Sequence, residues 1–349
     1  MQKSSGIKIT VGLVTYNRPE FLKEAVHSVL SQTFSDFELL ISNDHVESEV
    51  TFETLGIKHD TRIKIINQKK NLGEIRNLNY LLEIAQGEWF VWLADDDLFH
   101  QDFLKLATNA ILEYECKNVV GFFSNYIAAS NPYGLFPKPL KSSECIHYDA
   151  SSFLSNYTSR KNTLIGCYGV MRTDVLRKAG GLPQLGNSFS PYGDTLIPIL
   201  LIEYGNICWL DEKLIFLRTH AESQSCKSTQ FSAYTTAEIE FLEELKRVCS
   251  AVHVKINLDK IISNMVLWFS QNEWVVLNRN PDLQRYVAVK EFINYQMKFN
   301  LARLSTRYRI VHFLFIVRFL AKHFISNFYR GILNEIKNRL LLDSKKSLW

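Results

Sequence analysis

The sequence predicts an α/β fold in which a mostly parallel, doubly wound sheet is followed by a helical region. Short β-rich runs alternate with helical patterns over about the first 220 residues, and this alternation is typical of parallel sheets with helices on both faces. The run Trp89–Leu93 is continuously apolar, as in strands that are buried on both faces. From Ser228 onward the β patterns stop and long helical patterns begin. We therefore expect two domains, residues 1–227 and 228–349.

The individual elements can be placed in order along the chain. Strands are expected at 7–15, 37–42, 62–66, 89–93, 119–123, 163–170, 208–210 and 213–218. The first helix should follow Asn17, which can act as its cap; Glu20 would complete a capping box, and Pro19 fits the first turn. Further helices are expected near 75–85 and 103–111, after a cap at Thr173, and at 195–204. Residues 125–162, rich in Ser, Asn and Pro, should form an irregular loop over a site.

Composition limits the class of protein. The chain has 349 residues, of which 46% are hydrophobic and 22% charged, as in globular rather than disordered proteins. Its six cysteines stand singly, with no Cys-x-x-Cys pair. That spacing indicates neither a zinc site nor a disulfide framework, and it favours a reducing, cytoplasmic setting. The chain does not open on a signal-peptide pattern, and it lacks a charge-free stretch of about 18 apolar residues that could span a membrane.

The most informative feature is the run of three carboxylates, Asp95, Asp96 and Asp97, directly after the apolar strand. In open α/β sheets, ligands bind at the carboxyl ends of the strands, where this run should lie. Adjacent carboxylates repel one another unless a cation or water separates them. Oxygen ligands of this kind suit Mg²⁺ or Mn²⁺, which in turn hold phosphates. The alternative is a solvated acidic turn without metal.

Six motifs, taken in order, resemble a family 2 glycosyltransferase, which has the nucleotide-sugar-binding GT-A fold. The resemblance covers about residues 7–222, and its motifs form the ordered set Val14–Pro19, Ser42–Asp44, Asn71-x-Gly73-x-x-Arg76-Asn77, Ala94–Asp97, Gly193-Asp194 and Arg218-x-His220-x-x-Ser223. Each motif alone is weak, but their order and spacing together are specific. One departure matters: many relatives begin the acidic element with an acid where this chain has Ala94, which leaves open the role of each carboxylate.

The resemblance implies a site for a nucleotide-sugar donor and a divalent cation. Asp96 is the first choice of metal ligand, and Asp97 would join it directly or through water. His220 would contact the metal or the diphosphate. Asp95 would contact the ribose, Asp44 the base edge, and Arg76 the diphosphate or the base. The other implied donor-binding residues are Thr15, Asn17, Arg18, Asn71 and Gly73. Two of these assignments have structural alternatives: Asp44 could be a simple cap and Arg76 a surface residue of a helix.

Asp194 is the candidate general base. Inverting transfer needs one carboxylate that takes the proton of the acceptor hydroxyl as this hydroxyl attacks the anomeric carbon. Asp194 follows a Gly- and Ser-containing segment and opens a predicted helix. An aspartate at that position can also be an N-cap, and the two roles are compatible.

The resemblance therefore implies a metal-dependent, inverting hexosyl- or N-acetylhexosaminyltransferase. Its donor would be a UDP- or dTDP-linked sugar, and its acceptor a glycan or a lipid-linked glycan of bacterial surface polysaccharide, such as lipopolysaccharide or capsule. One alternative is a nucleotidyltransferase, for which a Gly-rich basic loop after the first strand is missing. The other is a non-catalytic nucleotide-sugar-binding module. The sequence leaves the oligomeric state open.

The C-terminal tail is basic. Residues 301–349 contain ten Lys and Arg against two acids, net +8, which leaves 30 basic and 34 acidic residues, net −4, in residues 1–300. Apolar residues from Ile310 to Phe328 recur at helical spacing between these cations. A basic amphipathic helix is typical of peripheral contact with an anionic membrane, here the inner face of the cytoplasmic membrane. The alternative is a helix packed on the protein. Nucleic acid is not an expected partner, since no reader motif accompanies the charge.

Overall fold

The computed structural model describes residues 8–132, 144–220, 223, 230–279, 292–296, 304, 308 and 314. The chain forms two compact units, residues 1–261 and 262–349, and each is described by itself. The division at 261 falls inside the region predicted to be helical, and the predicted domain boundary at 227 stays a prediction.

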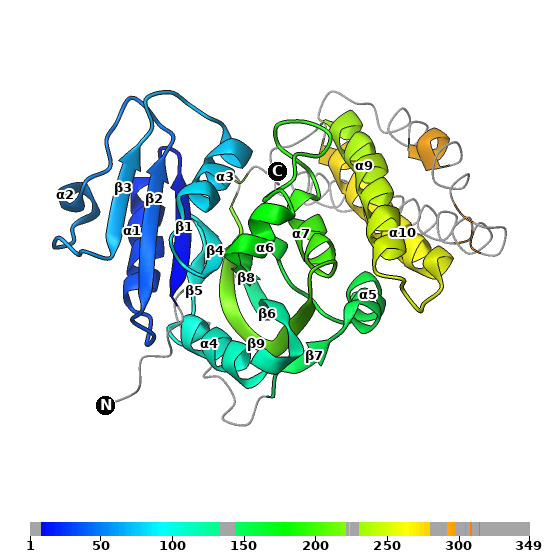
Figure 1. Ribbon diagram of the computed structural model, residues 1–349. Coiled ribbons are helices and arrows are strands. Elements are labelled where there is room, and N and C mark those ends of the chain that lie inside the picture. Colours follow the sequence, from blue (N-terminus) through cyan, green and yellow to red (C-terminus); the bar gives the residue numbers. More distant parts are fainter. Residues whose placement is uncertain are drawn as a thin grey trace, which may run out of the picture. The chain divides into compact units, whose positions relative to one another are not determined.

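The first unit is built around a nine-stranded sheet with the order β3-β2-β1-β4-β8-β6-β9-β5, in which β7 also pairs with β9. Four strands at one end are parallel: β1 (Ile9–Thr15), β2 (Phe37–Asn43), β3 (Ile63–Asn67) and β4 (Trp89–Ala94). β8 (Val170–Arg172) is antiparallel to both β4 and β6 (Val119–Ala129), so β6 and its parallel neighbour β9 (Asn206–Arg218) run in the direction of β4. The carboxyl ends of β1, β2, β4 and β9 therefore meet at one edge of the sheet (Figure 1).

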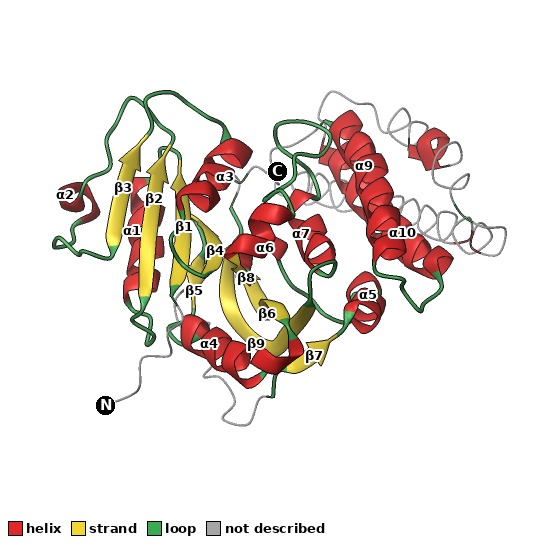
Figure 2. Ribbon diagram, in the orientation of Figure 1, coloured by secondary structure: helices red, strands yellow, loops and turns green. Residues whose placement is uncertain are grey.

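Helices cover the sheet, as the strand sequences predict (Figure 2). Val91 and Leu93 of β4 belong to a buried core with Leu22 and Val26 of α1 (Pro19–Leu30). The alternate residue Trp92 donates its indole N–H to the carbonyl of Leu78 in α3 (Glu74–Ile84), 2.9 Å away. β4 is thus buried against a helix on each face, which explains its uninterrupted apolar sequence and confirms the predicted fold class.

The remaining elements complete the first unit and lead into the second. They are α2 (Phe52–Leu55), β5 (Leu98–Phe99), α4 (Phe103–Glu113), η1 (Glu115–Lys117), β7 (Ile146–Tyr148), α5 (Ala150–Thr158), η2 (Gly166–Tyr168), α6 (Thr173–Lys178), α7 (Gly193–Leu201), α9 (Phe231–Ala251) and α10 (Leu258–Arg279). In the second unit, buried Gln296 accepts a hydrogen bond from Ser270 and donates one to Glu273. These polar groups are paired, as buried polar side chains must be.

Several predicted details are wrong. α1 begins at Pro19 after Arg18, not after Asn17; no side chain caps it, and Asn17 adopts a left-handed backbone with φ 54°. Residues 125–162 are not simply an irregular loop, since β6 continues to Ala129 and β7 and α5 follow. Of the strand expected at 163–170 only Val170 lies in a strand, β8, and Gly166–Tyr168 form the 3₁₀ turn η2; the two strands expected at 208–210 and 213–218 are one strand, β9. The side chain of Thr173 does not cap α6; it donates to the carbonyl of Gly87.

Among the described residues, no helix is both long and apolar enough to cross a membrane. The predicted membrane-binding tail, residues 301–349, lies outside the described residues except for Leu304, Tyr308 and Leu314. Its contact with membrane stays a prediction.

Candidate active site

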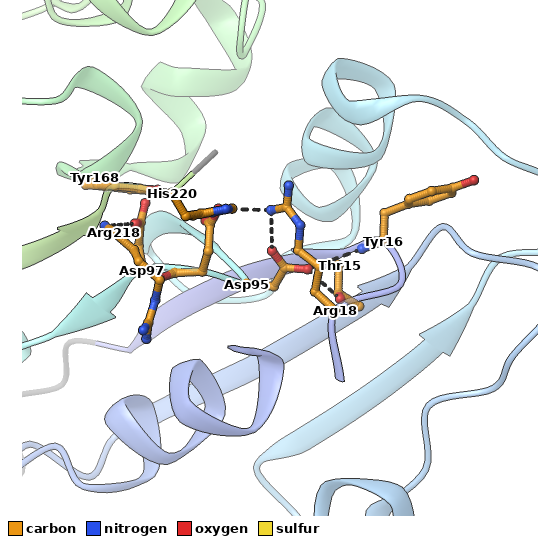
Figure 3. Close-up of polar contacts among 9 residues, drawn as sticks. Thr15, Tyr16, Arg18, Asp95, Asp97, Tyr168, Arg218 and His220 are labelled. Carbon is orange, nitrogen blue, oxygen red and sulfur yellow. Dashed lines mark hydrogen bonds and ion pairs between the residues drawn. The ribbon is translucent and has the colours of Figure 1, made fainter. Parts of the chain in front are cut away.

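Asp95 lies at the carboxyl end of β4 and is held by the last residue of β1 and by residues that follow it. Its Oδ2 accepts the Thr15 hydroxyl at 2.7 Å and the Tyr16 backbone N–H at 3.3 Å, and its Oδ1 accepts Arg18 Nη1 at 3.2 Å (Figure 3). β1 and β4 are neighbours in the sheet, with Val14 opposite Ala94. The two motifs, 80 residues apart in sequence, therefore meet because the parallel pairing aligns their carboxyl ends.

Asp96 is the meeting point of two side chains from opposite ends of the first unit's sequence. Its Oδ2 accepts Arg18 Nη1 at 2.9 Å and lies 2.8 Å from Nε2 of His220. The left-handed turn at Asn17 brings the chain around between Tyr16 and Arg18, and asparagine tolerates that conformation better than most residues. The structure thus joins the first and last predicted motifs at one carboxylate.

Asp97 is buried and both of its carboxylate oxygens are engaged. Oδ1 accepts the backbone N–H of Arg218 at 2.8 Å, and Oδ2 accepts the Tyr168 hydroxyl. These bonds tie the turn after β4 to the end of β9 and to η2. The predicted role of Asp97 as a metal ligand stays a prediction, but in this arrangement its oxygens position the acidic turn.

Arg218 also holds the turn that contains Asp95, Asp96 and Asp97. Its Nε donates to the backbone oxygen of Asp96 at 2.9 Å, its Nη2 pairs with Glu24 of α1, and its guanidinium carbon lies 4.5 Å from the centre of the Phe21 ring. The side chain is only 7% exposed. Arg218 therefore links β9, α1 and the acidic turn without using the carboxylate oxygens of Asp96.

Asp44 at the end of β2 holds the turn that precedes α3. Its two oxygens accept the backbone N–H groups of Leu72 at 2.7 Å and Gly73 at 2.8 Å. Asn71 also accepts the Gly73 N–H, and Gly73 has φ 82°, a conformation that favours glycine. Contact of Asp44, Asn71 and Gly73 with a nucleotide stays a prediction, as does the predicted role of Arg76, whose side chain is exposed on α3.

Asp194 lies in the first turn of α7 and is joined to the acidic turn through η2. A Cβ at Gly166 would stand 1.7 Å from the backbone oxygen of Asp194, so only glycine permits this approach. Two residues on, Tyr168 donates its hydroxyl to Asp97. η2 is thus a three-residue bridge between the predicted base and the carboxylates after β4. Directly before the helix, Tyr192 adopts φ 69°, the kind of strained backbone that clusters at functional sites.

Burial and mutual repulsion shape the electrostatics of the site. Burial raises the pKa of Asp95 and of Asp97, and the neighbouring charge of Asp96 adds to both effects. Burial also raises the pKa of Asp194, which is half-buried. The pKa of Glu74, the first residue of α3, is raised by burial and by the charges of Asp96, Asp95 and Asp194. Such a concentration of carboxylates with raised pKa values is characteristic of functional sites.

The side chains present fit a weak divalent-cation site rather than a closed one. Within the described part of the chain, no three His, Cys, Asp or Glu side chains are grouped as a metal cage. Asp96 and His220, 2.8 Å apart, do form a carboxylate–imidazole pair. Mg²⁺ and Mn²⁺ at phosphate-binding sites commonly use one or two protein ligands and take the others from phosphates and water. The pair therefore fits a metal that is completed by its substrate.

Three contributors to the site were not predicted from the sequence. Tyr16 is 54% exposed, and its ring makes an edge contact with His45, 5.1 Å between centres. Glu74 carries no motif signal, and Tyr168 lay in a predicted strand. The one available sequence signal was the place of Tyr16 inside the predicted motif Val14–Pro19.

The central sheet of the first unit, with helices on both faces and carboxylates at its carboxyl edge, has the features of the GT-A fold. Residues 10–179, just under half of the chain, match the family model of glycosyl transferase family 2. The match confirms the resemblance and contains the first four of the six motifs, whereas Gly193-Asp194 and Arg218–Ser223 lie beyond its end.

Known proteins similar to this chain carry the same assignment. An uncharacterized glycosyltransferase of Rickettsia typhi is 22% identical over 76% of this chain and 81% of its own length. TuaG of Bacillus subtilis, a glycosyltransferase assigned to teichuronic acid biosynthesis, is 26% identical over 68% of this chain and 90% of its own. The crystal structure of S. aureus TarS superposes with a TM-score of 0.58 at 15% identity, covering 88% of this chain and 87% of that one.

Proposed function

We propose that this protein is a metal-assisted, inverting glycosyltransferase that uses a UDP- or dTDP-linked hexose or N-acetylhexosamine. The observation that supports this most directly is the pairing of Asp96 with His220 at the carboxyl edge of the sheet, with Asp194 joined to the same edge through η2. The match to glycosyl transferase family 2 supports the reaction class. S. aureus TarS, which shares the fold, has been crystallised with UDP and with UDP-GlcNAc, in keeping with a uridine donor.

The donor nucleotide would lie over the ends of β1 and β2. Tyr16 offers an exposed ring on which a base can stack, and a stacked base is typically worth about 1–3 kcal/mol. Asp95, already oriented by Thr15, would accept a ribose hydroxyl. Arg18 would supply positive charge to the diphosphate, since a guanidinium can bind two oxygens at once.

A divalent cation, Mn²⁺ or Mg²⁺, would be held by Asp96 and His220, and when bound it would stabilise the charge that develops on the departing diphosphate. Asp97 and Arg218 would keep the acidic turn in place. The bonds between Asp97 and Arg218, and between Arg218 and the backbone of Asp96, do not use the carboxylate oxygens of Asp96.

Asp194 would take the proton from the acceptor hydroxyl as its oxygen attacks the anomeric carbon. Partial burial raises the pKa of Asp194, which makes the carboxylate a stronger base than an exposed aspartate. The leaving diphosphate and the base would then lie on opposite sides of the sugar, the arrangement that inversion requires. The acceptor would be a growing glycan or lipid-linked glycan of the bacterial surface, in line with the assigned pathway of TuaG.

The proposal is tested by donor hydrolysis with a panel of UDP-, dTDP- and GDP-sugars, with and without Mn²⁺. We expect metal-dependent release of sugar from at least one UDP- or dTDP-linked donor, with inverted anomeric configuration in the transfer product. Binding of nucleotide without any sugar release would indicate a non-catalytic module. Release of pyrophosphate from a nucleoside triphosphate and sugar phosphate would indicate a nucleotidyltransferase.

A further inference from the structure

The loop that leads into α7, residues 183–192, is closed by its own hydrogen bonds. The hydroxyl of Ser190 donates to the carbonyl of Pro183 at 2.6 Å and accepts the backbone N–H of Leu185 at 2.8 Å. The carbonyl of Ser190 in turn accepts the N–H of Gly193, the first residue of α7, at 3.0 Å. A displacement of this loop would therefore be passed on to the first turn of α7.

The middle of the loop lies directly on α9. The carboxylate of Glu240 accepts the backbone N–H of Gly186 at 2.7 Å. The side chain of Asn187 donates to that of Gln230, the residue directly before the helix, at 2.8 Å. Gly186 has φ 69°, and a Cβ there would stand 2.3 Å from the backbone oxygen of Ala233. Glycine is the residue that permits both this backbone conformation and this close approach.

Two aromatic rings of the same loop pack against Tyr234 of α9. The ring of Tyr192 meets that of Tyr234 edge-on, with 5.6 Å between the ring centres and 83° between the planes, and both side chains are buried. The ring of Phe189 lies 6.1 Å from that of Tyr234. Edge-to-face contact is a favoured geometry for aromatic pairs. Tyr192 directly precedes α7 with φ 69°, so this contact holds a backbone conformation that tyrosine rarely adopts.

The backbone on both sides of Asp194 is held by neighbouring elements. Its own backbone oxygen lies against Gly166 of η2. The carbonyl of the next residue, Thr195, accepts the hydroxyl of Tyr157 in α5 at 3.0 Å. Two residues before it, Tyr192 rests on α9, which lies beside α7 in the first unit (Figure 1). A side chain on a backbone held in this way can be aimed with the precision that catalysis needs.

We propose that Tyr234 of α9 is a positioning residue for the general base: it holds Tyr192 in the left-handed conformation and thereby sets the direction of Asp194. The proposal rests on the proposed function, in which Asp194 takes the proton of the acceptor hydroxyl. A strained backbone persists only where the surrounding packing enforces it, so loss of the Tyr234 ring should let the start of α7 relax. The nucleotide and the cation would bind at the ends of β1, β2 and β4. A change at Tyr234 should therefore act on the base and leave donor binding unaltered.

The test uses two pairs of variants of the full chain. Tyr234→Leu removes the ring that contacts Tyr192, whereas Tyr234→Phe keeps this ring and is the conservative control. Gly186→Ala places a Cβ against the backbone of α9. Its matched control is Gly56→Ala, because Gly56 has the same φ of 69° but open space around the added atom. The second pair therefore separates displacement of the loop from backbone strain alone.

Hydrolysis of UDP-GlcNAc, UDP-glucose and dTDP-glucose is measured in Mn²⁺, with water in place of the acceptor hydroxyl, together with the affinity for UDP. For Tyr234→Leu and Gly186→Ala we expect kcat to fall about 10- to 100-fold, the effect of misplacing a reacting group by about 1 Å. KM and Mn²⁺-dependent UDP affinity should stay unchanged. Tyr234→Phe and Gly56→Ala should keep the kcat of the wild type. Thermal unfolding identifies a variant that does not fold, and the other perturbing variant then carries the test.

A double-mutant cycle separates positioning of the base from support of the fold. In the Asp194→Asn background, Tyr234→Leu should cause little further loss of kcat, because the residue that it positions no longer acts as a base. If the two losses multiply in full, Tyr234 acts on something other than Asp194 and the proposal is wrong.

The other outcomes separate the proposal from the proposed function. If Tyr234→Leu and Gly186→Ala keep the wild-type kcat while Asp194→Asn loses it, the proposal fails although the proposed function stands. A loss of UDP affinity in step with kcat would show that α9 supports the whole unit, which also contradicts the proposal. If the wild type neither binds UDP nor hydrolyses any donor, or if Asp194→Asn keeps its turnover, the proposed function falls, and the proposal with it.

Discussion

Replacement of Arg218 by methionine should lower both the stability of the first unit and the affinity of its site for UDP. Arg218 donates to the backbone of Asp96, pairs with Glu24 and lies over Phe21. Methionine keeps much of the side chain's length and apolar contact but removes the charge and the donors. The turn with Asp95–Asp97 would then lose the hydrogen bond that Arg218 Nε donates to the backbone oxygen of Asp96.

The structure allows an estimate of the effect. Removing one partner of a fully buried ion pair costs about 3–5 kcal/mol. The Arg218 side chain is 7% exposed, but that of Glu24 is 36% exposed, and water can therefore rehydrate the glutamate. We discount accordingly and expect a loss of about 2–3 kcal/mol. In a unit of this size that corresponds to a fall in Tm of about 4–10 °C.

Arg247→Met is the matched control. Arg247 bonds two carboxylates, Glu203 and Glu244, but its side chain is 49% exposed, so its loss should cost about 0–1 kcal/mol. Denaturant unfolding of both variants, followed by circular dichroism, gives the two free energies. Arg218→Met should also weaken UDP binding in Mn²⁺. Equal losses of stability in the two variants would show that the burial of Arg218 does not set its contribution. Intact UDP binding in Arg218→Met would show that Arg218 does not position the acidic turn.

Two further predictions concern the base and the tail. Asp194→Asn should cut turnover about 10²–10⁴-fold with little change in donor binding; near-normal turnover would place the base elsewhere. Since the folded-state pKa of Asp194 is raised, its ionisation costs stability as pH rises, and Asp194→Asn should therefore stabilise the protein more at neutral than at mildly acidic pH. The acid limb of the wild-type kcat/KM profile should lie above the ordinary range of an aspartate. A chain truncated at Asn300 should lose salt-sensitive binding to anionic vesicles but keep donor hydrolysis, because every proposed site residue precedes 221; truncation that unfolds the protein, with a full chain that ignores vesicles at low salt, would indicate a packed tail.

The parallel half of the sheet could be predicted because its signals are local. Trp89–Leu93 is apolar without interruption since α1 and α3 cover both of its faces. The half of the sheet beyond β4 was harder to predict from the sequence. α5 depends on burial of Phe153, Leu154 and Tyr157 within a Ser-rich segment, and β9 crosses Asp211 and Glu212 at a place where its register with β6 shifts. Neither pattern has a clear period, because tertiary packing rather than local preference determines these elements.

The site was predicted where a residue type and a strand end coincide. Asp95, Asp96 and His220 meet as the ordered motifs implied, since parallel strands bring their carboxyl ends to one edge. The partners of Asp97 were not predictable, because η2 and the end of β9 reach it from far along the chain. Glu74 was not predicted because a glutamate at the start of a helix is common, and only its three-dimensional surroundings distinguish it.

The most direct test of the account is calorimetric titration of UDP into the wild type and Asp96→Asn, each with Mn²⁺ and with a chelator. Asp174→Asn, a substitution of an exposed aspartate on α6, is the control. We expect Mn²⁺ to strengthen UDP binding about 10-fold or more in the wild type and the control, because a cation held by Asp96 would also bind the phosphates. Asp96→Asn should lose this increment while its weak metal-free affinity persists. An unchanged Mn²⁺ increment in Asp96→Asn would contradict the assignment of the acidic edge as the metal-assisted donor site.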